Sequence, residues 1–236
     1  MIPVFFSCEH ATCAVPEPWR ELFRGHEEAV ASAEGWEPGA LNLAQGFSIN
    51  FRTPLAHGEV TRMLIDLEMD GDARWSRVSS PLTEVQKGKL CDRHLRPFRD
   101  AVHGKIKEAL RRESFVVHVL IRVGLADEGV VHLETVDGDE VAGRLANSWA
   151  QELRSGDESM SANAVGVPSV SAVGMSLREE FGVERLALVV LRVSQSYFLE
   201  GRPWRWPRAK KRLIESLELT IKALSPAPEC SSSAGD

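Results

Sequence analysis

Apolar runs alternate with amphipathic stretches along most of the chain. The runs that suit buried strands are Val4 to Cys8, Met63 to Leu67, Phe115 to Val123, Val130 to Leu133 and Leu186 to Val193. Because helical patterns separate these runs, we expect a mainly parallel or mixed sheet that is covered on both faces. The pattern therefore predicts an α/β protein with three α/β/α layers and a mainly parallel mixed sheet.

Three segments have the apolar spacing of helices with one buried face. A first helix is predicted from Ser80 and Pro81 to Leu110, because a serine cap and a proline in the first turn favour a helix start. We expect Pro97 to kink it. Further helices are predicted from Asp139 to Arg154 and from Pro207 to Leu224.

Length and composition indicate one globular domain. With 236 residues, of which 43% are hydrophobic, the chain can bury a substantial core, and we expect a single domain over residues 1–224. Residues 225–236 are rich in Ser, Pro, Ala and Gly and are predicted to be disordered. The short stretch 202–207, with Trp204 and Trp206, is either a recognition patch or, as we favour, packing for the last helix.

The charge and the apolar runs of the chain limit the kinds of partner that we expect it to bind. The formal net charge is −6 without a long block of like charge, which argues against a nucleic-acid partner. No apolar run is long enough to span a bilayer, and no signal peptide precedes the first strand, so we expect a cytoplasmic protein without a membrane partner. Four irregularly spaced cysteines indicate reduced thiols.

Polar side chains crowd the carboxyl end of the first predicted strand, where the sequence is SCEHATCAVP. Ligands bind at the carboxyl ends of strands in α/β sheets, so Glu9 and His10 are candidates for chemistry. Zinc held by Cys8, His10 and Cys13 would lack a fourth ligand, and a Cys13 nucleophile assisted by His10 would lack an orienting third group. An equally good interpretation is that Glu9 and His10 are loop residues whose side chains form hydrogen bonds with backbone amides.

Five segments together resemble the N-formylglutamate amidohydrolase family, from Val4 to about Leu224. They are SCEHATCAVP, GWEPGALNLA, TRMLIDLEMD, LCDRHLRPFRDAV and LVVLRVSQSYF. The resemblance implies a zinc carboxypeptidase-like, phosphorylase/hydrolase-like domain in which a zinc-bound water cleaves an amide bond. It places Glu9 and His10 at the metal loop and Asp66 on a strand beside the substrate.

The sequence departs from the family motifs at the positions that carry the chemistry. Arg122 stands where a metal-binding histidine is expected, and a guanidinium cannot ligate zinc. Arg192 stands where the family has the glutamate presumed to act as general base or acid, and it cannot accept a proton near neutral pH. Glu68 and Met69 replace an asparagine and an arginine, and Cys13 replaces the loop asparagine.

These departures share a physical logic. Without a metal ion, carboxylates such as Glu9 would lie unpaired in a partly buried cleft, at a cost of several kcal/mol for each buried charge. We therefore expect a salt-bridge cluster in place of the metal, formed by Arg122, Arg192, Glu9 and Glu68, with Asp66 as a further candidate member. In the alternation of a strand, Arg62 lies on the same face as Glu68 and could pair with it. We interpret His118 as a histidine of the core.

Two functions follow from this sequence. The favoured one is a degenerate amidohydrolase relative with weakened or lost catalysis and no zinc, which binds a small acylated amino acid or a related ligand. The alternative is an active zinc amidohydrolase acting on substrates such as N-formylglutamate. The candidate site comprises the catalytic positions Asp66 and Arg192, the metal positions Glu9 and His10, and the pocket residues Glu37, Arg62, Glu68, Arg122 and Cys13.

Overall fold

The computed structural model describes residues 2–125, 127, 129–156, 160–199 and 205–225. Its centre is a sheet whose strands are β1 (Val4–Cys8), β2 (Leu55–His57), β3 (Val116–Leu125), β4 (Val130–Val136), β5 (Ser161–Val167) and β6 (Leu186–Ser194). They lie in the order β2-β1-β3-β6-β4-β5. Neighbours run parallel except β4 and β6, which are antiparallel. The predicted mainly parallel mixed sheet is confirmed.

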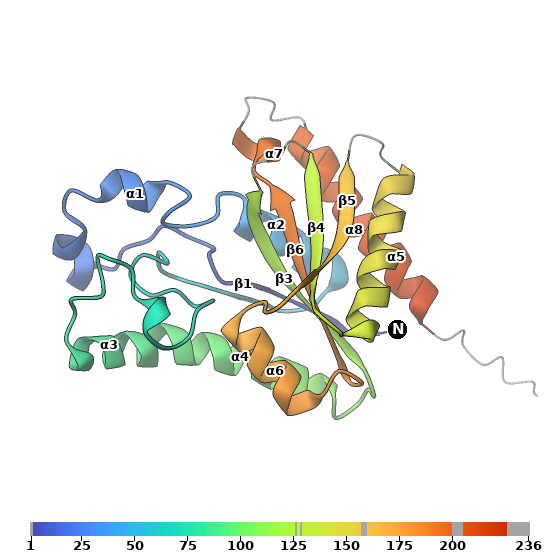
Figure 1. Ribbon diagram of the computed structural model, residues 1–236, viewed down its shortest axis with the longest axis horizontal. Coiled ribbons are helices and arrows are strands. Elements are labelled where there is room, and N and C mark those ends of the chain that lie inside the picture. Colours follow the sequence, from blue (N-terminus) through green and yellow to red (C-terminus); the bar gives the residue numbers. More distant parts are fainter. Residues whose placement is uncertain (1, 126, 128, 157–159, 200–204, 226–236) are drawn as a thin grey trace, which may run out of the picture.

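Helices cover both faces of this sheet (Figure 1). One layer contains α2 (Ala40–Phe51), α5 (Glu140–Gly156) and α8 (Arg205–Leu224). The other contains α4 (Arg96–Ala109) and α6 (Ala172–Phe181). The remaining helical segments are η1 (Glu17–Phe23), α1 (Glu27–Ala31), η2 (Gly71–Arg74), α3 (Glu84–Leu90), η3 (Cys91–Leu95) and α7 (Ser196–Leu199). The three-layer α/β/α architecture is therefore confirmed.

The larger apolar core lies between the sheet and the layer of α2, α5 and α8. Trp149 on α5 is fully buried there, and its ring meets Phe47 of α2 edge to face at 6.2 Å between centroids. Its indole N–H donates to the Ser216 hydroxyl of α8 over 2.8 Å. A buried Trp needs such a partner, so this bond fixes how α5 and α8 pack together.

One predicted strand is wrong. Residues 62–64 form a turn, and the segment from Met63 to Leu67 pairs with no strand. Its apolar side chains are instead buried in a second core cluster, which also contains Phe98 of α4 and Leu177 of α6. They anchor the loop that they belong to. The sheet gains the short edge strand β2 and the strand β5, whose Ser, Asn and Gly residues mask the apolar pattern of a strand.

The first predicted helix begins later and is irregular. α3 begins at Glu84, because Thr83 caps it in a reciprocal capping box with Gln86. Before α4 the chain makes a π-helical turn, η3, and Pro97 occupies the first turn of α4. The irregularity expected at Pro97 therefore takes the form of this π turn, since proline cannot donate the regular helical hydrogen bond.

Other expectations concern the ends of the chain. No described helix is both long and apolar enough to cross a membrane. The predicted tail lies outside the described residues from 226 onward, and so do Trp204 and Cys230. Trp206 is half-buried against the larger core, and its indole N–H donates to Asn42 of α2 over 3.0 Å. This contact agrees with a packing role for that end of the segment.

Candidate functional site

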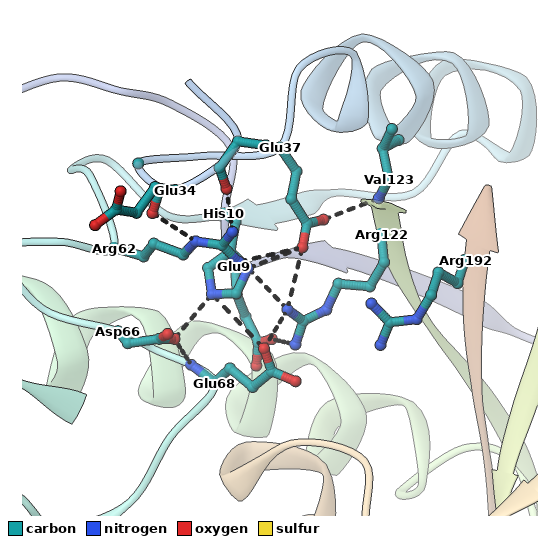
Figure 2. Close-up of polar contacts among 12 residues, drawn as sticks. Glu9, His10, Glu34, Glu37, Arg62, Asp66, Glu68, Arg122, Val123 and Arg192 are labelled. Atoms are coloured by element: carbon teal, nitrogen blue, oxygen red, sulfur yellow. Dashed lines mark hydrogen bonds and ion pairs between the residues drawn. The ribbon is translucent and has the colours of Figure 1, made fainter. Parts of the chain in front are cut away.

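Candidate site residues meet at the carboxyl ends of β1 and β3 (Figure 2). Glu9 and His10 follow β1 directly, and the parallel register of Ser7 with Leu120 brings Glu9 level with Arg122 near the end of β3. A loop after β2 adds Asp66 and Glu68 from the opposite side. This loop is held by the buried side chains of Met63, Leu64, Ile65 and Leu67. The wrongly predicted strand is thus the anchor of the site.

Arg122 is the centre of a buried ion-pair network. Its Nη2 contacts the carboxylate of Glu9, and its Nη1 donates to Glu68 Oε2 over 2.7 Å. Nη1 also lies 3.6 Å from Glu37 Oε1. The Arg122 side chain is only 2% exposed, and although burial disfavours its charge, these three carboxylates raise its pKa. The contacts of Arg122 predicted with Glu9 and Glu68 are present.

His10 lies between two carboxylates. Its Nε2 is 2.8 Å from Asp66 Oδ1, and its Nδ1 is 3.0 Å from Glu37 Oε1. Burial and the charge of Arg122 disfavour the imidazolium, but the hydrogen bonds to Asp66 and Glu37 prevail and raise the pKa of His10. The same contact lowers the pKa of Asp66 against the effect of its burial. His10 therefore bridges the loop that carries Asp66 and the loop that carries Glu37.

Glu37 joins the strand to this bridge. It precedes α2, and its Oε2 accepts the backbone N–H of Val123 over 2.9 Å while its own N–H donates to the carbonyl of His10. Burial opposes its ionisation, yet the hydrogen bond to His10 and the charge of Arg122 lower the pKa of Glu37 to about 2. Glu37 is thus an integral member of the network, and it lies before α2 and not in the first turn of that helix.

Arg62 does not pair with Glu68. Its guanidinium donates to the carbonyls of Glu34 and Ala33, which fixes it against the loop that precedes α2. Its Nη1 lies 3.7 Å from Glu37 Oε1 and 3.3 Å from His10 Nδ1. Arg62 therefore supplies a second positive charge beside Glu37.

Arg192 lies outside the predicted cluster. It is the register partner of Arg122 on β6, but its Nε and Nη2 bind the carboxylate of Glu134 on β4 at 2.7 and 3.1 Å. Glu134 is not among the predicted site residues, because the pairing of β4 with β6 joins distant parts of the chain. Glu134 lies two residues after His132, so the two side chains are on the same face of β4. His132 is the register partner of Arg192, which places Glu134 within reach of the Arg192 side chain.

The network leaves one carboxylate oxygen without a partner. Glu9 Oε1 is buried and has no hydrogen-bond partner among the described residues. Burial raises the pKa of Glu9, and the charge of Arg122 offsets this effect only in part. Four carboxylates, Glu9, Glu37, Asp66 and Glu68, therefore share two guanidinium groups and one imidazole, and the site retains unsatisfied acceptor capacity beside Arg122.

Three of these side chains have donor atoms close enough for a metal ion. One atom each of His10, Asp66 and Glu68 lies within 4.8 Å of the others, so the grouping includes His10 but not Glu9 of the predicted metal pair. The set suits a divalent cation poorly while Arg122 is in place, because its Nη1 already binds Glu68 Oε2 and lies 2.9 Å from His10. A divalent ion about 4 Å from a guanidinium would be repelled by roughly 8 kcal/mol at an effective dielectric of about 20.

The thiols and His118 lie apart from this network. Cys13 is half-buried against the second core cluster, and burial strongly raises the pKa of the Cys8 thiol. Among the described residues, the group of side chains with donor atoms close enough for a metal ion includes neither Cys8 nor Cys13. His118 is fully buried, with Nε2 2.9 Å from the Ser7 hydroxyl, and burial lowers its pKa to about 3. It is a neutral core histidine, as predicted.

Comparison with known proteins identifies solved structures of the same fold. No protein-family model and no curated protein sequence matches the chain. The gene product Atu2144 from Agrobacterium tumefaciens is similar with a TM-score of 0.77 and 20% identity, over 94% of this chain and 90% of that one. An N-formylglutamate amidohydrolase from Ralstonia eutropha JMP134 is similar with a TM-score of 0.67 and 14% identity, over 95% of this chain and 96% of that one. The three proteins share one fold over nearly their full lengths.

Proposed function

We propose that this protein is a relative of the N-formylglutamate amidohydrolases in which a fixed arginine has replaced the catalytic metal. In this proposal the protein does not hydrolyse amides and instead binds a small acylated amino acid or a related ligand. Two independent features support the relationship: the ordered sequence motifs, and the fold shared with an amidohydrolase structure. At the present identity the likeness in structure concerns the fold, so the activity remains a proposal.

One observation carries the loss of catalysis. The guanidinium of Arg122 contacts Glu9, Glu68 and His10 at once, in the position where the sequence motifs lead us to expect a metal ligand. A guanidinium neutralises these carboxylates but cannot bind and activate a water molecule as a Lewis acid. The positive charge of the pocket is therefore part of the chain.

Metal analysis and an amidase assay test this proposal together. We expect purified protein to contain far less than one zinc ion per chain and to release no formate from N-formyl-L-glutamate. We also expect N-formyl-L-glutamate or N-acetyl-L-glutamate to bind saturably in a titration calorimeter. Stoichiometric zinc with turnover would establish the alternative, an active zinc amidohydrolase, which the grouping of His10, Asp66 and Glu68 favours.

A variant distinguishes a filled metal site from a site that never bound metal. Arg122→His removes the guanidinium and restores an imidazole, so we expect it to gain zinc affinity relative to the wild type. The matched control is Arg192→Gln, which removes the arginine at the paired position on β6 and should gain none. If Arg122→His does not fold, zinc titration of Arg122→Gln provides the same comparison. Equal zinc affinity in all folded variants would contradict the replacement of the metal by Arg122.

A further inference from the structure

A partly polar cavity lies beside the edge strand β2. It has a volume of about 210 Å³ and is formed by the end of β2, the π turn η3 and the first turns of α4. Its apolar wall includes Leu55 and Phe98, and its polar wall includes His57, Glu59, Arg93 and His94. None of these residues belongs to the Arg122 network. The cavity is large enough for several water molecules or for a small organic ligand.

The two charged side chains of this cavity do not pair with one another. Among the described residues, neither Arg93 nor Glu59 forms an ion pair with any group. Both nevertheless act on the ring of His94, whose pKa is lowered by burial and by Arg93 and raised by Glu59. Arg93 and Glu59 are exposed side chains of opposite charge, and both line the cavity together with this imidazole.

His94 provides an independent indication of a missing partner. Both of its ring nitrogens are buried, and neither has a hydrogen-bond partner in the described parts of the chain. A buried polar atom without a partner is costly, so such atoms are normally satisfied by water or by a ligand. A neutral imidazole offers one donor and one acceptor, which a ligand that carries both kinds of group would satisfy.

The local backbone presents these groups to the cavity. Arg93 and His94 belong to the π turn η3, and π turns within helices occur often at functional sites. His57 and Glu59 follow one another around the carboxyl end of β2, where Gly58 donates its N–H to the carbonyl of Cys8. Arg93 and His94 are therefore carried by a helical turn, and Glu59 by the loop that follows β2.

We propose that this cavity is a binding site for a small zwitterion, of the class of free α-amino acids. Arg93 binds the carboxylate of the ligand, Glu59 binds its ammonium group, and its side chain lies against Leu55 and Phe98. A ligand with both charges matches the cavity because it complements Arg93 and Glu59 without adding net charge. An anion alone would leave Glu59 beside a second negative charge.

Isothermal titration of the full chain tests this site with L-alanine and L-leucine as probes. We expect saturable binding of both amino acids and at least about tenfold weaker binding of propionate and of isobutylamine, which each lack one charge. Arg93→Gln and Glu59→Gln should each weaken amino-acid binding by about tenfold or more. The matched controls are Arg96→Gln and Glu113→Gln, which remove the same charges outside the cavity, and they should bind like the wild type.

A spectroscopic measurement locates the ligand. Binding at this site should shift the imidazole ¹⁵N resonances of His94. The variant His94→Phe identifies these resonances, because they are absent from its spectrum. The proposal is overturned if neither amino acid binds saturably, if the singly charged analogues bind equally well, or if Arg93→Gln and Glu59→Gln retain wild-type affinity. These outcomes do not depend on zinc content or amidase activity, so the test is independent of the proposed function.

Discussion

Arg122 and Arg192 are register partners on β3 and β6, yet their guanidinium groups bind different carboxylates and lie in different surroundings. Arg122 is 2% exposed and bound to Glu9 and Glu68, whereas Arg192 is 26% exposed and bound to Glu134. Two arginines at one level of the sheet therefore have different structural roles. The buried arginine neutralises the pocket, and the half-exposed arginine joins β6 to β4.

This difference predicts unequal effects on stability. Arg122→Gln should lower the free energy of unfolding by about 3–5 kcal/mol, because it leaves buried carboxylates without their counter-charge. Arg192→Gln should lower the free energy of unfolding by about 1 kcal/mol, since the ion pair of Arg192 with Glu134 is partly exposed and contributes less to stability. Urea denaturation at pH 7 measures both values. Equal losses for the two variants would contradict a central role for Arg122.

Glu37 should make the protein sensitive to acid below pH 4.5. Its pKa is about 2 in the folded protein and 4.5 as a free group, so its stabilising effect is complete above pH 4.5 and is lost as the pH falls toward 2. At pH 7, Glu37→Gln should be less stable than the wild type by about 3 kcal/mol, and this difference should shrink toward pH 2. Urea titrations at several pH values measure it. A difference that is constant with pH would show that the charge of Glu37 is not involved.

His118 should cause a separate loss of stability that begins at higher pH. Its folded pKa of about 3 lies below the free value of 6.5, so the unfolded chain binds the proton first. Stability should therefore fall as the pH decreases from 6.5 to about 3, by at most about 5 kcal/mol. The double variant Ser7→Ala with His118→Leu removes the histidine and its partner together, and it should show a smaller slope over this range.

The two slopes are compared between pH 6.5 and 4.5, above the range where Glu37 contributes. If the double variant and the wild type have the same slope there, His118 does not titrate as its burial requires.

Gly58 should tolerate no side chain. A Cβ atom at this position would lie 2.0 Å from the carbonyl oxygen of Glu9, so Gly58→Ala must displace the backbone that carries Glu9 and His10. We expect Gly58→Ala to lose at least about 2 kcal/mol of stability. Gly88→Ala is the matched control on the exposed side of α3, where no atom lies within 4 Å, and it should gain up to about 1 kcal/mol. Thermal and urea denaturation separate the two outcomes.

Local sequence patterns were sufficient to predict much of the architecture and the chemical character of the site. The apolar runs around β1, β3, β4 and β6 have the length and composition of buried strands, and helices between them require a sheet covered on both faces. Side-chain chemistry alone excludes Arg122 as a zinc ligand. The contact of Glu9 with Arg122 also followed, because parallel strands place their carboxyl ends at one edge of the sheet.

Long-range packing decided the rest. The segment from Met63 to Leu67 is as apolar as a strand, but burial under a loop and burial in a sheet select the same residues, so composition does not distinguish them. Arg192 binds Glu134 because β4 runs antiparallel to β6. Glu37 binds the backbone N–H of Val123 because the loop before α2 lies against the end of β3. The sequence by itself determined which side chains are charged or apolar. Only the tertiary structure decided which charges meet, because each pairing depends on contacts between residues far apart in the chain.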